Sequence, residues 1–539
     1  MNEFMTKIIL LFISFLATIQ IYAQQNIELV SNLPYENGLS DIWAYVDTSG
    51  IEYALVAVKG NSGGSNGGLS IVSLEDAENP EEVFFAPGTS STWRDIKTYN
   101  GYAYVTTEAA DGLMIVDLNG LPDTNSIVVS SYFDQLWITA HNLYIDENGI
   151  MYVFGAGNDS LGVDGVLMYD LNLDPLEPDF IGEYNVAYVH DGMARGDTLY
   201  TANVYAGNFS IIDVSDPENP IYLGGAETPD TFTHNIWVSD DGDFVYTTDE
   251  VSSAYIASYD ISDLNDIEEQ DRIQFDPGSS TIVHNVHFLN EYLITSYYKA
   301  GITIHDVSDP TNMVQTGHYD TSPLSGSGFD GAWGVTPFLP SGLILASDIS
   351  EGLFVLDATY TRAARLQGAI SDNENGNPIF GANVEILDSE YFSTAESNIL
   401  GDYSTGIAEF GFFDVLVSKE GYLDVLVEDV ELINDEITIL NISMVSDLVN
   451  TINEELLSDI QIYPNPVIDR LIIEIPSFDQ LEDISMLISD LSGRIVQSEL
   501  IMSSNSVIDI SNNLQQGVYV LSLYSSETAL YKSKFIVSK

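Results

Sequence analysis

The chain has 539 residues, and its 15 basic and 82 acidic side chains give a formal net charge of −67. Nucleic-acid binders need a basic surface that displaces counterions, so this charge excludes DNA and RNA as partners. Because 45% of the residues are hydrophobic, the chain can bury several cores, and its length predicts three or four folded domains. The lack of cysteine excludes disulfides, thiolate metal sites and cysteine nucleophiles.

The N-terminus has the pattern of a secretory signal. Lys7 precedes an apolar run that starts at Ile8, and the segment ends at Ala23. This pattern predicts that residues 1–23 are a signal peptide, with a signal anchor as the alternative. No later run reaches the roughly 20 apolar residues that span a bilayer. We therefore expect an exported protein without a transmembrane segment after signal removal.

A strand-like segment that ends in aspartate recurs up to about residue 360. Its copies repeat with a period of about 47 residues, in the range of a four-stranded propeller blade. A variant that ends in Ser73 precedes the copies that end in Asp. The seven segments are residues 68–73, 112–117, 165–170, 209–213, 255–260, 301–306 and 352–357.

Each period also supplies further strands. A hairpin with Asn-Gly or Asp-Gly at its turn precedes the segment, and an Asp-Pro or Asn-Pro turn and a fourth strand follow it. We expect Asp213, Asp260 and Asp306, which end third strands, to form these turns. The last unit lacks a fourth strand, whereas residues 26–31 form an additional strand before the first unit. Pairing residues 26–31 with residues 352–357 closes the ring, so residues 24–360 are predicted to form a seven-bladed β-propeller.

Two smaller regions follow the repeats. Glycine turns between alternating strands predict a small β-sandwich at residues 366–444. A linker at residues 445–459 separates it from a second strand-rich region at residues 460–539, which we expect to fold as its own β-sandwich. The predicted fold class is therefore all-β, a seven-bladed β-propeller followed by two small β-sandwich domains.

Spaced motifs occur in all three regions. In the repeats they are Trp93-Arg-Asp-Ile-Lys97, Ala140-His-Asn142, Thr233-His-Asn235, His284-Asn285 and Gly328-Phe-Asp-Gly-Ala-Trp333. Residues 366–444 contain Gly401-Asp-Tyr403, and residues 460–539 contain Ile462-Tyr-Pro-Asn-Pro466, Asp490-Leu-Ser-Gly-Arg494 and Gly517-Val-Tyr-Val-Leu521.

These motifs resemble known families. The repeats are similar to LVIVD-repeat propellers, and the short motifs in them resemble the exported choice-of-anchor B family. Residues 366–444 resemble a carboxypeptidase-regulatory-like domain, which implies a spacer or accessory module. Residues 460–539 resemble the type IX (Por) secretion C-terminal sorting domain. That resemblance implies the type IX machinery as a partner and a secreted or outer cell-surface location reached via the periplasm.

Histidines share one recurrent position in the hairpins. An alignment without gaps places it at the start of each innermost strand, where four of the seven histidines of the chain occur. The residue that follows is mostly Asp or Asn, although a buried strand is normally apolar. The first position holds Trp43, Arg94, His141, His190, His234, His284 and Trp333, and the second holds Ala44, Asp95, Asn142, Asp191, Asn235, Asn285 and Gly334.

Carboxylates are expected at the same end of the ring, because the start of strand one lies beside the end of strand two in a hairpin. Imidazole and carboxylate groups together could bind a divalent metal, the candidate cofactor. The predicted metal ligands are His141, His190, His234, His284, Asp249 and Asp348. The predicted ligand-binding residues are Arg94, Asp95, Glu108, Asn142, Asp191, Asn235, Glu250, Asn285 and Trp333.

Three interpretations of this pattern stay open. The recurrent polar residues could satisfy backbone groups of neighbouring strands, form a metal or ligand site, or position an acid and a base. No residue is assigned a catalytic role. We expect a module that binds an extracellular protein or glycan, with a metal-dependent hydrolase or lactonase as the alternative.

Overall fold

The computed structural model describes residues 24–60, 67–157, 165–389, 393–447, 460–476, 478, 484–490, 494–511, 514–525 and 528–539. The predicted signal peptide and most of the predicted linker lie outside these residues. The one helix in the described part is the 3-10 turn η1 (Thr124–Ser126), and every other element there is a β-strand. No helix in these ranges is long and apolar enough to cross a membrane. The all-β class is therefore confirmed.

The chain divides into two compact units, one of residues up to 305 with 317–360, and one of residues 306–316 with 361–539. Six four-stranded sheets, each of four consecutive strands, succeed one another up to Tyr319. Their strands are β2 (Leu39–Val46), β3 (Glu52–Val58), β4 (Gly67–Ser73), β5 (Glu81–Gly88), β6 (Ile96–Tyr99), β7 (Tyr102–Val105), β8 (Leu113–Asp117), β9 (Val128–Tyr132), β10 (Asn142–Ile145), β11 (Ile150–Phe154), β12 (Val166–Asp170), β13 (Asp179–Tyr184), β14 (Asp191–Arg195), β15 (Thr198–Asn203), β16 (Asn208–Asp213), β17 (Ile221–Glu227), β18 (Thr233–Val238), β19 (Phe244–Asp249), β20 (Ile256–Asp260), β21 (Glu268–Ile273), β22 (Val286–Leu289), β23 (Tyr292–Tyr297), β24 (Gly301–Asp306) and β25 (Val314–Tyr319).

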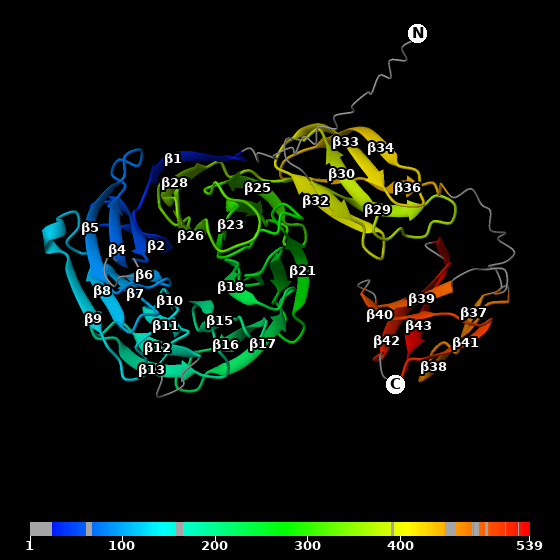
Figure 1. Cartoon of the computed structure of the whole chain (residues 1–539), viewed down its shortest axis with the longest axis horizontal. Helices are drawn as coiled ribbons and strands as arrows, with labels where there is room; N and C mark the ends of the chain where they lie inside the picture. Colours follow the sequence, from blue (N-terminus) through cyan, green and yellow to red (C-terminus); the bar gives the residue numbers. More distant parts are fainter. Residues whose placement is uncertain are drawn as a thin grey trace, which may run out of the picture. The chain divides into compact units, whose positions relative to one another are not determined.

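A seventh four-stranded sheet joins the two ends of this region. Its strands are ordered β1 (Ile27–Leu33), β28 (Gly352–Ala358), β27 (Ile344–Asp348) and β26 (Ala332–Thr336). β1 runs antiparallel to β28 from the pair Ile27 and Ala358 to the pair Leu33 and Leu353, which confirms the predicted pairing of the first strand with the last. Figure 1 shows the sheets following one another around a centre, with β5, β9, β13, β17 and β21 on the outside. This arrangement is consistent with the blades of a β-propeller.

Aspartate side chains hold the turns between strands. Asp47 Oδ1 accepts the backbone N–H groups of Ser49 and Ile51 at 2.8 and 2.9 Å, so the turn between β2 and β3 is fixed by its own sequence. The third-strand aspartates act in the same way. Asp213, Asp260 and Asp306 each accept the N–H group of the residue two positions later, at 2.9 Å, and their predicted role as turn formers is confirmed.

Apolar side chains of neighbouring sheets pack face to face. Leu55 and Ile71 of one sheet share a buried cluster with Ala103 and Val116 of the next. Removal of this apolar surface from water stabilises the stack of sheets, at about 25 cal/mol per Å² buried. Each sheet is thus fixed by the two sheets beside it, and the inner strands are held at the centre of the ring.

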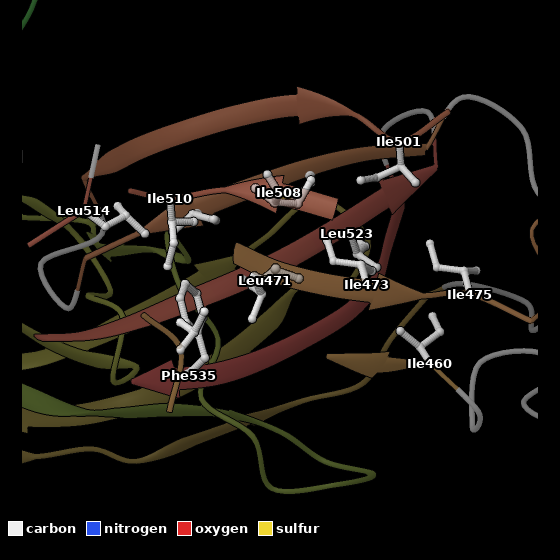
Figure 2. Close-up of a cluster of buried hydrophobic side chains, with 14 of the residues drawn as sticks. Ile460, Leu471, Ile473, Ile475, Ile501, Ile508, Ile510, Leu514, Leu523 and Phe535 are labelled. Atoms are coloured by element: carbon white, nitrogen blue, oxygen red, sulfur yellow. The ribbon is translucent and has the colours of Figure 1, made fainter. Parts of the chain in front are cut away.

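The described residues of the second unit form four further sheets and two separate hydrophobic cores. One core contains Leu366, Val384, Val415 and other residues up to Met444, and the other contains residues from Ile460 to Val537. Figure 2 shows side chains of the latter core gathered between its strands. The first core lies with β29 (Ala364–Asp372), β30 (Asn383–Leu387), β31 (Thr394–Glu396), β32 (Asp402–Ile407), β33 (Gly411–Ser418), β34 (Val425–Leu432), β35 (Ile437–Ile439) and β36 (Ile442–Met444), and the second with β37 (Gln461–Tyr463), β38 (Arg470–Glu474), β39 (Ile484–Ser489), β40 (Ile495–Leu500), β41 (Asn505–Asp509), β42 (Gly517–Ser525) and β43 (Thr528–Val537).

The substitution Ile27→Ala tests how much the pairing of β1 with β28 stabilises the ring. Ile27 is 1% exposed and packs in a cluster with Phe354 and Leu356. Loss of its buried methyl groups should lower the free energy of unfolding of the first unit by about 2–5 kcal/mol. Glu28→Ala, on the same strand but exposed, is the control and should change it by less than about 0.5 kcal/mol. Equal denaturation midpoints for the two variants would contradict a stabilising closure.

Candidate functional site

The inner strands place the predicted site residues at one end of the ring. Arg94, His141, His190 and His284 lie just before inner strands, and His234 lies within β18. Residues one and three positions later on these strands form two further layers. The site is therefore built from residues that several sheets contribute at matching heights.

The four predicted histidines form one row of rings. The ring centroids of His141 and His190 are 4.0 Å apart, and those of His190 and His234, and of His234 and His284, are each 4.3 Å apart. Trp333 continues the row at 5.1 Å from His284. The structure thus brings together the side chains that the sequence alignment placed at equivalent positions.

Backbone carbonyls of the next sheet orient two of these rings. The Nδ1–H group of His284 donates to the carbonyl of Trp333 at 2.6 Å, and that of His190 donates to the carbonyl of His234 at 3.3 Å. These bonds support the structural interpretation, because each ties the inner strand of one sheet to that of the next. They also fix the tautomer, so the Nε2 atoms of these rings keep a free lone pair.

A small pocket opens beside the row. Its enclosed volume is about 20 Å³, within about 290 Å³ of empty space that includes open solvent. Eight of the predicted site residues line it, together with Trp93 and Asp41. The lining residues are Asp41, Trp93, Arg94, Asp95, His141, Asn142, His234, His284, Asn285 and Trp333.

The layer next to the histidines is polar and links neighbouring sheets. Asn235 donates to Asp191 at 2.7 Å and accepts the N–H group of Val286 at 3.0 Å. Lys97 Nζ lies 2.6 Å from Asp95 and 3.6 Å from Asp41. Asp95, Asp191 and Asn235 therefore join strands of different sheets or pair with a buried cation.

An aromatic layer lies two positions further along the strands. The rings of Trp237 and His287 are 4.6 Å apart, and Trp237 also stacks on Phe338 at 5.8 Å. Lys97 Nζ lies 4.5 Å from the ring centroid of Trp43, a cation–π contact between the polar and aromatic layers. This layer is packed, so the accessible pocket is confined to the histidine end.

The position assigned to Trp43 and Ala44 from the alignment is wrong by three residues. Trp43 belongs to the aromatic layer, and Asp41 occupies the place of Asp95 and Asn235. A Cβ atom on Gly334 would come within 2.4 Å of Asp41 Oδ1, so the missing side chain at Gly334 makes room for this carboxylate. The matching strings Asp41-Ile-Trp43 and Asn235-Ile-Trp237 carry the correct register.

Two of the predicted carboxylates reach the histidines. Glu108 Oε1 is 2.6 Å from His141 Nδ1. Glu250 Oε2 lies 3.8 Å from His234 Nε2, and its Oε1 atom lies 3.7 Å from His284 Nε2. Glu250, assigned from the sequence to ligand binding, thus stands where a metal-binding carboxylate was expected.

Asp249 and Asp348, predicted as metal ligands, are not brought to the histidines. Asp249 accepts hydrogen bonds from the hydroxyl of Thr228 and from two backbone N–H groups of residues 230 and 232. Asp348 accepts the hydroxyl of Thr321 and two backbone N–H groups of its own turn. Successive side chains of a strand point to opposite faces, which separates Asp249 from Glu250.

Burial keeps His190, His234 and His284 neutral. It lowers the pKa of His284 to about 3 and the pKa values of His190 and His234 well below their usual range. It also raises the pKa of Glu250 and of Asp191 to about 7. Burial opposes ionisation of Asp95 as well, but the charge of Lys97 and the hydrogen bonds to the carboxylate together outweigh this effect, and the pKa of Asp95 is lowered.

Some buried polar atoms of the pocket lack hydrogen-bond partners among the described residues. They are Asn142 Oδ1, Asn285 Oδ1, Arg94 Nε and His234 Nδ1. Leaving a buried polar group unpaired costs about 1–3 kcal/mol, so the pocket offers hydrogen-bonding capacity that the protein itself does not use. Together with neutral imidazoles, these atoms can bind a small polar group or a metal ion.

Comparisons with known families agree with two of the resemblances. Residues 461–538 match the family model described as the secretion system C-terminal sorting domain. Residues 92–121, 193–228 and 283–321 match the LVIVD repeat. No curated protein matches the chain. The chain thus carries LVIVD repeats and a type IX sorting domain, which implies handling by the type IX machinery and secretion or attachment at the cell surface.

The raised pKa of Asp191 predicts that the stability of the ring depends on pH. Its folded value of about 7 exceeds the unfolded value near 3.9, so the native state binds the extra proton. The stabilising contribution of protonated Asp191 is therefore fully present below about pH 4 and is lost as the pH rises to about 7. Asp41 and Glu250, whose pKa values are also raised by burial, act in the same direction.

The substitution Asp191→Asn should reduce the dependence of stability on pH while preserving the contact with Asn235. At pH 8 the variant should be more stable than the wild type by up to about 4 kcal/mol, and at pH 4 the two should agree. Urea titrations at both pH values measure the difference. A wild type that gains stability between pH 4 and pH 7, with an unchanged slope in the variant, would contradict this account of Asp191.

Proposed function

We propose that this protein is an exported propeller that binds a ligand through the pocket at the histidine end of its ring. In this proposal the seven four-stranded sheets are the seven blades of a closed propeller, related to the choice-of-anchor B family. The single observation that carries it is the convergence of residues from several blades on one pocket. Some of its buried polar atoms lack hydrogen-bond partners among the described residues.

The pocket suits the end group of a larger extracellular molecule. Its enclosed space of about 20 Å³ is too small for a folded partner or a whole sugar ring, but it accepts one small polar group at the end of a larger molecule. Trp93 is 41% exposed at the rim, and Trp333 stands at the end of the histidine row. Aromatic faces of this kind contribute large contact area at low entropic cost. A glycan or peptide terminus is therefore the proposed ligand.

The remaining regions would deliver and present this propeller. A signal peptide at residues 1–23 would take the chain to the periplasm, and the sorting domain would direct it across the outer membrane. Residues 366–444, proposed as a carboxypeptidase-regulatory-like sandwich, have a hydrophobic core of their own. An independent core is what a spacer between the binding module and the sorting domain needs.

A metal-dependent hydrolase or lactonase is the second candidate, and the Glu108–His141 pair favours it. A carboxylate 2.6 Å from an imidazole orients the ring and strengthens it as a base. Ester and lactone substrates, tested with purified protein, separate the two functions. A hydrolase should lose about 10²- to 10⁴-fold in rate in Glu108→Gln, whereas a binding module has no turnover to lose.

The pocket predicts a specific effect of Trp333 on ligand binding. Glycan and peptide arrays identify the ligand, and quenching of tryptophan fluorescence then measures its affinity. Trp333→Ala should weaken binding at least about ten-fold, while Trp333→Phe, which keeps an aromatic face, should retain most of it. Leu173→Ala is the control, because Leu173 is 80% exposed and does not line the pocket. Equal affinities for all three variants would place the ligand elsewhere.

The sorting domain predicts the fate of a truncated chain. Deletion of residues 461–538 should stop passage across the outer membrane, because the match to the sorting domain covers this segment. Fractionation of the native host should then show the propeller in the periplasm, with the signal peptide removed. Undiminished release or surface display of the truncated chain would refute this role.

A further inference from the structure

Three side chains at the pocket form a group with the composition and spacing of a metal site. They are His234 of β18, Glu250 directly after β19, and His284 two residues before β22. One ligand atom of each lies within 4.8 Å of those of the other two. The group thus joins two neighbouring sheets of the ring.

The separations within this group are too long for hydrogen bonds and close to those around one ion. The two Nε2···O distances of 3.8 and 3.7 Å exceed the 2.7–3.2 Å of a typical N–H···O bond. Donors about 2.0–2.2 Å from a tetrahedral zinc ion lie about 3.3 Å from one another. Because all three ligand atoms lie within 4.8 Å of one another, each donor has to move by less than about 1 Å to share an ion.

The surroundings hold two of the three donors, His284 and Glu250, in orientations that suit metal binding. The bond from His284 Nδ1 to the carbonyl of Trp333 leaves its Nε2 lone pair on the side of Glu250. Tyr298 donates its hydroxyl to Glu250 Oε1 at 2.5 Å, and its ring packs 4.8 Å from that of His284. Metal sites use such outer partners to fix the orientation of their ligands. The same burial that keeps the imidazoles neutral disfavours a lone carboxylate, and a cation would remove that penalty.

We infer that His234, Glu250 and His284 bind one Zn²⁺ ion, which forms part of the ligand pocket. Two imidazoles and one carboxylate suit zinc, whereas Ca²⁺ and Mg²⁺ take oxygen ligands almost exclusively. His234 and His284 line the pocket, so a fourth ligand can reach the ion from there. This inference deepens the proposed function, because it assigns the pocket a metal to which an oxygen of the bound end group can bind.

Zinc binding by the mature chain, made without a histidine tag and stripped with EDTA, tests the inference. Calorimetric titration with Zn²⁺ at pH 7.5 should show one tight site per chain. Glu250→Gln should weaken this site by at least about 100-fold. Tyr298→Phe, which removes only the outer hydrogen bond, should weaken it by about 10- to 100-fold. Glu351→Gln, an exposed acid-to-amide change outside the pocket, is the matched control and should bind as the wild type does.

Cobalt gives a second readout that weak binding to the acidic surface does not reproduce. Co²⁺ in a site with nitrogen ligands should give visible absorption bands, which Glu250→Gln should abolish while its circular dichroism spectrum stays native. A folded wild type that takes up no zinc, or a Glu250→Gln variant that binds zinc equally well, would overturn the metal site.

These measurements distinguish a failure of the metal site from a failure of the binding function. Ligand affinity is measured with and without EDTA in wild type and Trp333→Ala. Dependence on Trp333 in a protein that never binds zinc would refute the metal and retain the binding function. Zinc binding at Glu250 without any dependence of ligand affinity on Trp333 or on zinc would support the metal site and refute the pocket as the ligand site.

Discussion

The hydrogen-bond ladder of each sheet ends at its inner strand, and the backbone groups beyond that strand need partners from the next sheet. Side chains supply them. Asp95 and Asn235 accept N–H groups of Leu143 and Val286 in the following sheets. His190 and His284 donate to carbonyls of the sheets that follow them. Unpaired buried backbone groups are costly, so this requirement explains why polar residues recur where a buried strand would otherwise be apolar.

The same requirement creates the candidate site. Histidines that serve a neighbouring carbonyl through Nδ1 present Nε2 on the other side, and the neighbouring sheets bring these atoms into one row. Few cations are available to balance the buried acids of the ring, because the chain has only 15 basic residues. Lys97 lies between two of these acids, and Arg94 lines the pocket. The structural role and the capacity for binding thus belong to the same side chains.

Much of the fold and part of the candidate site could be predicted from the sequence. The period near 47 residues and the additional strand at residues 26–31 predicted the order of the sheets and the pairing of β1 with β28. The register of the inner strands was harder to predict, because an alignment without gaps does not allow for irregular strand pairing. Such irregularities lie between Leu39 and Ile42 and between Thr233 and Asn235. Alternation along β19 could have separated Asp249 from Glu250. Sequence spacing alone could not show that Glu250 lies between two histidines of different sheets.

The closure of the ring by β1 and β28 has a consequence for the order of events during synthesis. The first strand leaves the ribosome more than 300 residues before its partner, so its edge stays unpaired for most of translation. The ring cannot be complete until residue 358 has been made. The sorting domain begins a further hundred or so residues later. The sorting domain is thus made only after every strand of the ring is available to fold.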